Sequence, residues 1–473
     1  MLKSGSHIHL MGICGTAMAS LAGMLKGMGY KITGSDQNVY PPMSTQLEEL
    51  GISIMEGYKK ENLEPKPDLV IVGNVITCKH EEAQALLVSD IPYTSLPKAL
   101  GEFVIAKRNS IVLAGTHGKT TTTAIMAWIA ECCDKKPGFL VGGIPLNFSQ
   151  SFCFPQGNWF VIEGDEYDTA FFDKVPKFIY YKPKYVVLTS VEFDHVDIYS
   201  DLSDVKKVFQ QLIDSLPKDG LLVVNAEDQV AIELASQCRA KVVTYGLNKG
   251  DYSVADRQIL LGRNQFTVVY RGKRLVDIAI KLFGPHNTMN ALAAFALVRE
   301  MGWPLRDTLN GLASFKGVKR RQEIIGEPHG ITVVEDFAHH PTAVELTLAT
   351  MGERFRGRKI IALFEPRSAT SRRRIFQQDY IKALSPADVV IVAKPYDQSK
   401  ITKEERFSSE DLVASLVQRG RKAFVGENTQ SIIDILVTQA QPKDVILIMS
   451  NGDFGGIYGK LLEALQTGPL NKK

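Results

Sequence analysis

Short apolar runs alternate with longer amphipathic stretches from the start of the chain. The segments 7–12, 31–36 and 68–74 have the length and composition of strands, and helix-length stretches lie between them. Consecutive parallel strands need long crossover connections, which are usually helical. The pattern therefore predicts a parallel sheet with crossover helices, as in the mononucleotide-binding half of a Rossmann-like fold.

The same alternation continues in two further blocks. The central block has predicted strands at 158–166, 184–195, 220–228 and 240–246. The last block has them at 330–343, 358–366, 387–395, 422–427 and 443–456. Polar segments at 103–110 and 314–323 separate the blocks. We therefore predict an α/β fold of three domains in series, a Rossmann-like domain, a P-loop-type domain with a mostly parallel sheet and a second Rossmann-like domain, at 1–106, 107–318 and 319–473.

Bulk composition narrows the function classes. The chain has 473 residues, of which 45% are hydrophobic and 23% charged, and its formal net charge is +3. This balance is typical of globular proteins, and it argues against a nucleic-acid partner or a polybasic membrane arm. The six cysteines form no C-x-x-C pair, which favours reduced thiols and a cytoplasmic location.

One segment needs separate treatment because it has the length of a membrane span. Residues 8–25 contain no Asp, Glu, Lys or Arg. Gly12, Gly15 and Gly23 interrupt the segment, so we expect a buried strand followed by a helix. The chain is expected to be soluble, to have no membrane partner and to act as a monomer.

Residues 111–126, IVLAGTHGKTTTTAIM, run from an apolar strand into a helix through a glycine-containing turn. Such a turn points backbone N–H groups at phosphate oxygens, and the helix start adds its positive end. Lys119 can reach the β- and γ-phosphates, and Thr120 can bind Mg²⁺. The turn is shorter than the usual G-x-x-x-x-G-K-[ST] loop, because Leu113 stands five positions before Gly118. An ordinary turn before a helix is the alternative.

Acidic residues follow two predicted strands of the central block. Glu163 ends one strand, and further acids follow it at Asp165, Glu166 and Asp168. His195 stands past another strand, between Asp194 and Asp197. Mg²⁺ prefers oxygen ligands and keeps waters and phosphates, so Thr120 with one or two such side chains is sufficient. The alternatives are a solvated acidic loop and, for His195, a hydrogen-bonded structural role.

Two further segments carry polar side chains that could contact a nucleotide. Asn287 and Asn290 share a helical face and could contact a purine edge, although helix capping is favoured from this stretch alone. The polar segment 314–323, between the second and third blocks, contains Lys319, Arg320 and Arg321. These side chains could bind phosphates, or they could be a solvated run of charges on the surface.

The turn GICGTA at 12–17 is a weak signal because it departs from G-x-G-x-x-G. A turn that merely packs a helix on a strand explains it equally well. Together with Asp36 at the end of the second strand, it raises the hypothesis of a Rossmann oxidoreductase. The phosphate loop weighs against that hypothesis.

The motifs AGTHGKTTT, EGDEYD, EFDHVD, GPHNTMN, KRR and DFAHHP occur in this order. Together they resemble the Mur ligases of bacterial cell-wall synthesis, whose version of the phosphate loop is shortened in the same way. The resemblance covers nearly the whole chain. It implies an ATP-dependent ligase that converts the lactyl carboxylate of UDP-N-acetylmuramate into an acyl phosphate, which an amine then attacks.

Within this family, residues 163–168 and 192–197 are most similar to members that act in peptidoglycan recycling. Those members add the murein tripeptide L-alanyl-γ-D-glutamyl-meso-diaminopimelate to UDP-N-acetylmuramate. The alternative is a ligase that adds L-alanine. A nucleotide-sugar sensor without turnover is a third hypothesis, which the intact Lys119, Glu163 and His195 disfavour.

The resemblance also implies roles for individual residues. The catalytic set is Lys119, Glu163, His195 and Arg321. The ATP-binding set is Gly115, Thr116, His117, Gly118, Lys119, Thr120, Thr121, Asn287, Asn290, Arg321 and Asp336. Mg²⁺ is expected at Thr120, Glu163 and His195. The N-terminal domain is expected to bind the UDP-sugar through Gly12, Cys14, Gly15, Thr16, Ala17, Met18, Asp36 and Asn74. The peptide is expected at Arg367 and His340.

Two positions depart from the family pattern. Phe209 stands where several members carry a carbamylated lysine, so no carbamate is expected and the shell of a second metal is not defined. Phe337 stands where the family often has tyrosine, so that hydroxyl is missing.

Overall fold

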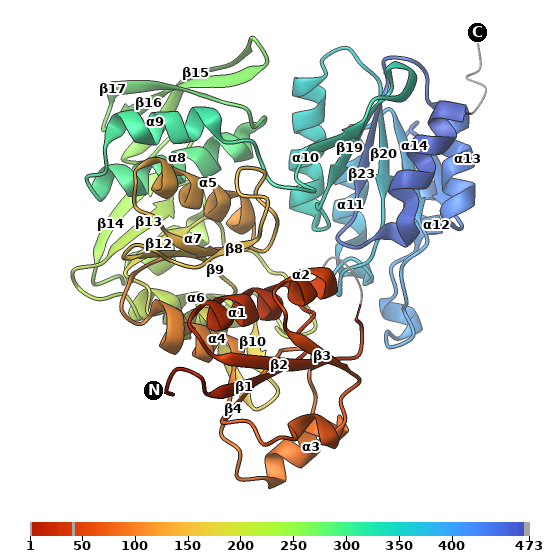
Figure 1. Cartoon of the computed structure of the whole chain (residues 1–473). Helices are drawn as coiled ribbons and strands as arrows, with labels where there is room; N and C mark the ends of the chain where they lie inside the picture. Colours follow the sequence, from red (N-terminus) through yellow and green to blue (C-terminus); the bar gives the residue numbers. More distant parts are fainter. Residues whose placement is uncertain (1, 40–42, 468–473) are drawn as a thin grey trace.

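The N-terminal unit is built on a five-stranded parallel sheet in the order β3-β2-β1-β4-β5 (Figure 1). The computed structural model describes residues 2–39 and 43–467. The strands are β1 His7–Met11, β2 Lys31–Asp36, β3 Ser53–Glu56, β4 Leu69–Val72 and β5 Tyr93–Ser95. The main helices are α1 Thr16–Gly27, α2 Met43–Glu49 and α3 Glu81–Val88. Residues 8–25 form β1 and α1 as predicted, and the described part of the chain has no helix long and apolar enough to cross a membrane.

The central unit has a ten-stranded sheet in the order β17-β16-β15-β14-β13-β12-β6-β9-β7-β8. Its first strands are β6 Asn109–Ala114, β7 Gly138–Leu140, β8 Phe152–Cys153, β9 Trp159–Gly164, β12 Tyr185–Leu188, β13 Leu221–Asn225 and β14 Lys241–Tyr245. The helices are α5 Lys119–Cys132, α6 Leu202–Asp214, α7 Gln229–Ala235, α8 Pro285–Glu300 and α9 Leu305–Ser314. β6 pairs in parallel with β9 and β12, so the loops after these three strands meet at one edge.

One end of the central sheet is an antiparallel extension that the strand pattern did not predict. It consists of β15 Tyr252–Leu260, β16 Arg263–Tyr270 and β17 Lys273–Ile280. Alternate residues of β15, such as Asp256 and Gln258, are exposed. An antiparallel sheet with one solvated face gives this weaker alternation instead of a continuous apolar run. A separate two-stranded ribbon, β10 Asp168–Ala170 with β11 Asp173–Pro176, follows the Glu163 strand.

The C-terminal unit has a six-stranded sheet in the order β18-β19-β23-β20-β21-β22. Only β18 is antiparallel to its neighbour. The strands are β18 Glu323–Gly326, β19 Thr332–Asp336, β20 Ile360–Phe364, β21 Val389–Ala393, β22 Lys422–Gly426 and β23 Val445–Met449. The main helices are α10 Pro341–Arg354, α11 Gln377–Leu384, α12 Ser409–Gln418, α13 Thr429–Gln439 and α14 Ile457–Thr467. The five strands predicted for this block are confirmed as β19 to β23.

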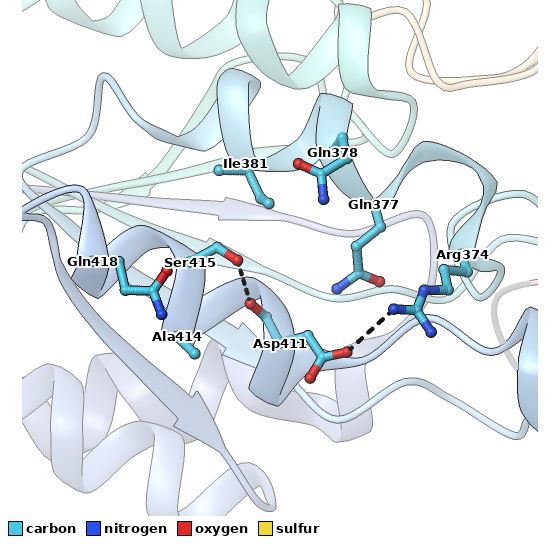
Figure 2. Close-up of a pocket in the computed structure, with 8 residues that line it drawn as sticks. All are labelled: Arg374, Gln377, Gln378, Ile381, Asp411, Ala414, Ser415 and Gln418. Atoms are coloured by element: carbon cyan, nitrogen blue, oxygen red, sulfur yellow. Dashed lines mark hydrogen bonds and ion pairs between the residues drawn. The ribbon is translucent and has the colours of Figure 1, made fainter.

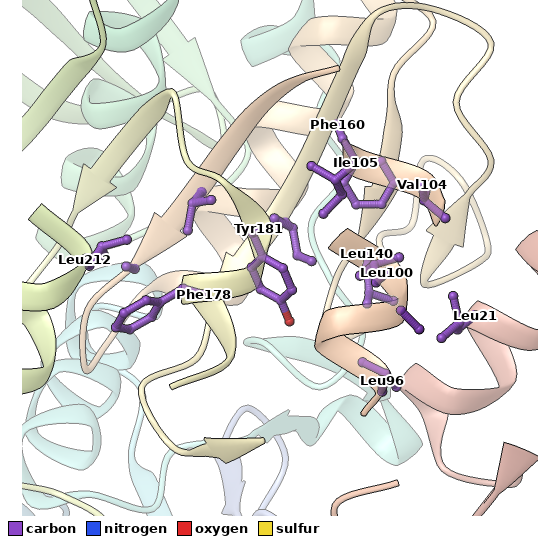
Figure 3. Packing of buried hydrophobic residues seen from close by; sticks show 14 of the residues in the cluster. Leu21, Leu96, Leu100, Val104, Ile105, Leu140, Phe160, Phe178, Tyr181 and Leu212 are labelled. Carbon is purple, nitrogen blue, oxygen red and sulfur yellow. The ribbon is translucent and has the colours of Figure 1, made fainter. Parts of the chain in front are cut away.

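A single hydrophobic cluster spans the N-terminal and central units (Figure 3). It includes three fully buried side chains: Leu21 of α1, Leu100 of the π-helical turn Leu100–Ile105, and Phe160 of β9. Burial of apolar area contributes roughly 25 cal/mol per Å² and is the main force that holds such layers together. The N-terminal unit is therefore fastened to the central unit by a shared core.

The C-terminal unit is joined differently. Its two hydrophobic clusters contain only residues from 325 onward, among those the structure describes. Polar pairs contact the central unit: Arg257 binds Glu353 at 2.8 and 2.6 Å, and Thr370 Oγ1 donates to Asp194 at 2.6 Å. One aromatic pair, Phe193 with Phe376, also spans the joint, with ring centres 6.3 Å apart. The three large sheets occupy residues 7–95, 109–280 and 323–449, and the boundaries at 106 and 318 stay predictions.

Candidate active site

The phosphate loop joins β6 to α5 and depends on two glycines. Gly115 has φ 124° and Gly118 has φ 81°, a backbone region that favours glycine. A Cβ on Gly115 would lie 2.2 Å from Thr189 Oγ1, so the close approach of these strand ends also requires glycine. Among the described residues, no side chain caps the start of α5. Its first N–H groups are therefore open to an anion.

Lys119 lies in the first turn of α5 and is largely buried. Its Nζ donates to Gly115 O at 2.6 Å and to Glu166 Oε2 at 3.0 Å. Burial opposes the positive charge, but the Glu166 carboxylate outweighs this effect and raises the pKa of Lys119. Glu166 was not among the predicted site residues. Its carboxylate forms an ion pair with Lys119 in the structure.

Thr120 and Glu163 meet as predicted. Thr120 Oγ1 donates to Glu163 Oε2 at 3.0 Å, and the backbone N of Gly142 donates to the other carboxylate oxygen. Parallel pairing of β6 with β9 places Glu163 beside Leu113, at the edge where the loop begins. Burial, with the nearby Asp165 carboxylate, raises the pKa of Glu163 to about 7.

His195 joins the same group of charges through Glu166. Its Nε2 lies 3.4 Å from Glu166 Oε1, and its backbone has φ 53°. Burial lowers the pKa of His195, but the Glu166 carboxylate outweighs this, so the net shift is upward. Asp194 accepts the backbone N–H of His195 at 2.7 Å and the Thr370 hydroxyl at 2.6 Å. The predicted His195 is therefore at the site, with Glu166 as its partner.

Phe209, at the position where several family members carry a carbamylated lysine, belongs to the hydrophobic core. Phe209 is fully buried and stacks on Phe178 with ring centres 6.4 Å apart. Lys206 binds Glu233 at 2.7 Å, and Lys207 binds Asp204 at 2.9 Å. Both lysines are therefore engaged on the outside of α6.

The two asparagines of α8 lie against the phosphate loop. Asn290 Nδ2 donates to Asn287 Oδ1 at 3.2 Å, and Asn287 Nδ2 donates to Phe283 O at 2.8 Å. A Cβ on Gly118 would lie 2.6 Å from Asn290 Oδ1. α8 begins at Pro285 without a side-chain cap from the described residues, so the capping alternative is wrong. The shared helical face is confirmed.

The joint between the central and C-terminal units carries Arg321 to the phosphate loop. Arg321 Nη2 donates to Thr120 Oγ1 at 3.4 Å, and its guanidinium lies 4.7 Å from the Phe337 ring centre. Asp336 ends β19 and accepts the backbone N–H of Gln322 at 2.9 Å. Burial raises the pKa of Asp336. The alternative of a solvated charge run is therefore wrong for Arg321.

Three other predicted nucleotide residues line the loop. Thr116 Oγ1 accepts the backbone N–H of Glu192 at 2.8 Å, and Thr121 is buried in the first turn of α5. His117 Nε2 lies 3.3 Å from Glu192 Oε2. Glu192 also accepts the Thr342 hydroxyl at 2.8 Å. Burial opposes ionisation of Glu192, but these partners outweigh it and lower its pKa to about 2.

The N-terminal turn is held by Asp36. Its carboxylate accepts the backbone N–H groups of Cys14 at 2.8 Å and Asn38 at 2.9 Å. Gly12 has φ 81°, and no side chain of the described residues caps α1. The other UDP-sugar candidates lie along this turn, in the first turn of α1 and after β4: Gly15, Thr16, Ala17, Met18 and Asn74. Asp36 thus has a structural task in addition to the predicted contact.

The two predicted peptide residues, Arg367 and His340, have different neighbours in the structure. Arg367 binds Asp453 at 2.8 Å, and its guanidinium lies 4.2 Å from the Tyr396 ring centre. His340 lies 4% exposed at the start of α10, with its ring centre 4.9 Å from that of His117. Burial lowers the pKa of His340 to about 4.

A surface pocket of about 380 Å³ lies elsewhere, between α11 and α12 (Figure 2). Arg374 and Asp411 face each other across it at 3.8 Å. It is lined by none of the predicted site residues. The converging charges at the phosphate loop, and not this pocket, mark the candidate active site.

Three family profiles match successive parts of the chain. The Mur ligase family catalytic domain matches residues 7–108, the Mur ligase middle domain 113–298 and the Mur ligase glutamate ligase domain 320–452. The UDP-N-acetylmuramate–L-alanyl-gamma-D-glutamyl-meso-2,6-diaminoheptandioate ligase of Escherichia coli K12 is 40% identical over 460 residues, 97% of this chain and 98% of that one. The chain belongs to the Mur ligase family. It is thus an ATP-dependent ligase that forms amide bonds, and the oxidoreductase and sensor hypotheses are wrong.

Two solved Mur ligase structures resemble the whole chain. A murein peptide ligase from Psychrobacter arcticus is 35% identical with a TM-score of 0.72, covering 98% of this chain and 99% of that one. A UDP-N-acetylmuramate–alanine ligase from Thermotoga maritima is 27% identical with a TM-score of 0.81, again covering 98% and 99%. These likenesses confirm the predicted three-domain α/β fold.

Proposed function

We propose that this chain joins L-alanyl-γ-D-glutamyl-meso-diaminopimelate to the lactyl carboxylate of UDP-N-acetylmuramate at the expense of ATP. The observation that carries the proposal is the convergence of Lys119, Thr120 and Glu163 at one sheet edge, in a chain 40% identical to a ligase named for these substrates. In the cell the reaction returns a recycled peptide to a cell-wall precursor. The six free cysteines fit a reducing, cytoplasmic compartment.

The chemistry follows from the need to make a carboxylate electrophilic. The lactyl carboxylate attacks the γ-phosphorus of ATP, the bond to the β-phosphate oxygen breaks, and ADP leaves. The free α-amine of the tripeptide then attacks the acyl carbon, and inorganic phosphate and a proton leave. Positioning of two anions and neutralisation of their charge supply most of the catalysis. We assign that task to Lys119, which lies at the phosphate loop, and Arg321 would add a second positive charge from the joint.

The donor set at the sheet edge fits Mg²⁺. The Thr120 hydroxyl and the Glu163 carboxylate lie 3.0 Å apart and offer oxygen atoms only, which Mg²⁺ prefers. His195 would serve a second ion and is held by Glu166. When bound, Mg²⁺ screens the repulsion between the nucleotide phosphates and the attacking carboxylate.

The remaining contacts are assigned by position. Residues 12–18 and Asp36 would hold the UDP moiety at the open start of α1. Asn287 and Asn290 would contact adenine beside the loop. Arg367, which binds Asp453, would take a carboxylate of the peptide. The chain is proposed to act as a monomer.

Addition of L-alanine is the second candidate, favoured by the TM-score of 0.81 to the Thermotoga maritima enzyme. For a three-domain protein, however, this score depends strongly on how the domains are oriented. Sequence identity is higher to the murein peptide ligase, 35% against 27%, which favours the tripeptide.

A donor panel tests the proposal. Purified full-length protein is given ATP, Mg²⁺ and UDP-N-acetylmuramate, with tripeptide, L-alanine or no amine, and phosphate release is measured. We expect sustained release only with the tripeptide, and none when either Mg²⁺ or UDP-N-acetylmuramate is omitted. Release with L-alanine and none with tripeptide would transfer the chain to the alanine-adding activity. Release that is independent of UDP-N-acetylmuramate would rule out both.

A further inference from the structure

Three side chains with metal-binding groups converge between the phosphate loop and the start of α10. They are His117 from the loop, Glu192 after β12 and His340 at the first position before α10. Glu192 Oε2 lies 3.3 Å from His117 Nε2 and 3.8 Å from His340 Nδ1, and all three ligating atoms lie within 4.8 Å of one another. Two imidazoles and one carboxylate thus face a common point.

His340 is the unusual member of this cluster. It is 4% exposed, and neither of its ring nitrogens has a hydrogen-bond partner among the described residues. Buried polar atoms are nearly always paired, because leaving them unpaired costs about 1–3 kcal/mol. Its Nδ1 is directed at the Glu192 carboxylate from a distance too long for a hydrogen bond. A ligand between them would satisfy the ring.

His117 and Glu192, the two members of the cluster from the central unit, are held by hydrogen bonds from neighbouring hydroxyls. Thr116 Oγ1 accepts the backbone N–H of Glu192 at 2.8 Å and donates to its carbonyl at 3.2 Å. Thr189 Oγ1 donates to His117 O at 2.5 Å. On the opposite side, Thr342 Oγ1 donates to Glu192 Oε2 at 2.8 Å and orients the carboxylate. Metal ligands in proteins are typically oriented by such outer partners.

We propose that His117, Glu192 and His340 bind one divalent transition-metal ion, with Zn²⁺ as the best fit, and that this ion bridges the central and C-terminal domains. Two imidazoles and a carboxylate are a common set for Zn²⁺, whereas Mg²⁺ takes oxygen ligands. Zn–N and Zn–O bonds of about 2.0–2.2 Å require ligand atoms within about 4 Å of each other, so side-chain adjustments of about 1 Å close the site.

This site differs from the Mg²⁺ pair of the proposed mechanism and does not depend on that mechanism. The Mg²⁺ pair, Thr120 and Glu163, lies within the central domain. The Zn²⁺ site takes His340, which directly precedes α10, the helix that Figure 1 shows on the side of the C-terminal unit next to the central unit. Occupancy therefore fixes the C-terminal domain against the phosphate loop and makes domain closure sensitive to Zn²⁺.

The test is Zn²⁺ binding by the full-length protein in excess Mg²⁺, measured by competition with a chromophoric chelator. The absorption spectrum of the Co²⁺-substituted protein supplies the second readout. The wild type is expected to bind one Zn²⁺ per chain and to unfold at a higher temperature when Zn²⁺ is added. Glu192→Gln and His340→Gln are expected to bind Zn²⁺ at least about 100-fold more weakly, since loss of a ligand exceeds loss of an outer partner.

Two matched variants separate this site from its surroundings. Glu163→Gln changes a proposed Mg²⁺ ligand, and His329→Asn removes an exposed histidine of the same domain as His340. Neither residue is a ligand of the proposed Zn²⁺ site, so both variants should bind Zn²⁺ like the wild type. If Glu192→Gln or His340→Gln does not fold, Thr342→Val keeps all three ligands and should weaken Zn²⁺ binding about 10-fold. Unchanged affinity in the ligand variants, or in Thr342→Val where it replaces them, would overturn the proposal. So would loss of binding in Glu163→Gln.

Discussion

The two joints of this molecule are built from different interactions. The N-terminal and central units share one apolar cluster, in which Leu21, Leu100 and Phe160 are fully buried. The central and C-terminal units meet through polar pairs, chiefly Arg257 with Glu353 and Thr370 with Asp194. Each joint connects units that follow one another in the sequence, but among the described residues only the first has a hydrophobic cluster that both units share.

This difference predicts which joint moves. Apolar burial cannot be exchanged for water without loss, whereas partly exposed ion pairs are replaced by hydration at little cost. Interfaces of the second kind are the ones at which domains rotate and close. We therefore expect the UDP-sugar side to stay fixed relative to the phosphate loop. The C-terminal unit, which brings Arg321 and Asp336, is expected to open and close.

The largest effect is expected for Lys119→Ala. This variant tests whether UDP-N-acetylmuramate binding by the N-terminal unit can be separated from the reaction at the phosphate loop. Loss of the charge at the phosphate loop should lower kcat at least about 1000-fold, because charge neutralisation dominates phosphoryl transfer. Binding of UDP-N-acetylmuramate, measured calorimetrically, should be unchanged, since its predicted site is in the N-terminal unit. The exposed Lys249→Ala serves as the control. A kcat near that of the wild type would remove Lys119 from the reaction.

Most of the fold could be predicted because its strands are buried on both faces. Runs such as 111–114 and 445–449 are continuously apolar, and each is followed by a polar residue or a glycine. The antiparallel strands β15 to β17 escaped prediction because one face is solvated and a bulge between Ala255 and Gln258 interrupts the alternation.

The candidate site could be predicted from the sequence as far as local motifs extend. Lys119 and Thr120 are set by the turn before a helix, and Glu163 by the end of a strand. Glu166 is one of several acids that follow the Glu163 strand, and no local motif singles it out, because its contact with Lys119 spans 47 positions along the chain. Glu192 cannot be recognised as a partner from the sequence for the same reason, because its contact with Thr342 joins the central and C-terminal units. Only the packed structure defines such pairs.

A core substitution breaks the apolar joint. Leu100→Ala should lower the free energy of unfolding by about 2–5 kcal/mol through lost burial and the cavity left behind. All three tryptophans, Trp128, Trp159 and Trp303, lie in the central unit, so tryptophan fluorescence in urea reports on that unit. The midpoint should therefore fall even though Leu100 belongs to the predicted N-terminal domain.

The matched variant is Leu416→Ala, which removes an equally buried leucine from a C-terminal cluster. It should leave the tryptophan-detected midpoint nearly unchanged, because the polar joint transmits little stability. An equal drop in both variants would show that the two joints are coupled alike, and the comparison would fail.

Lowering the pH should reduce the folding stability, because His286 at the polar joint has a low pKa in the folded protein. Burial, reinforced by Arg257 and Arg321, lowers the pKa of His286 to about 4, against 6.5 for an exposed histidine. Between these values the unfolded chain binds a proton that the folded chain does not, so stability falls as pH drops below 6.5. At pH 5 the loss is about 2 kcal/mol. His286 also contacts Gln322 of the joint at 3.0 Å.

The measurement is urea unfolding at pH 7.5 and pH 5, in the wild type and in His286→Gln. The variant should lose less stability between the two pH values, by about 2 kcal/mol. The exposed His329→Asn should retain the wild-type dependence. Identical pH dependence in the wild type and His286→Gln would show that this histidine is hydrated in the folded protein.

The smallest effect is expected for the ion pair that spans the polar joint. In a double-mutant cycle of Arg257→Ala and Glu353→Gln, the coupling energy from thermal unfolding should be at most about 1 kcal/mol and should shrink with added salt. The bidentate geometry, at 2.8 and 2.6 Å, favours the upper end of that range.

The Arg271–Asp251 pair, which lies within the central unit, gives the reference value. A coupling of several kcal/mol, insensitive to salt, would mean that the C-terminal unit is fastened as firmly as the N-terminal one. Closure would then need a hinge other than this joint.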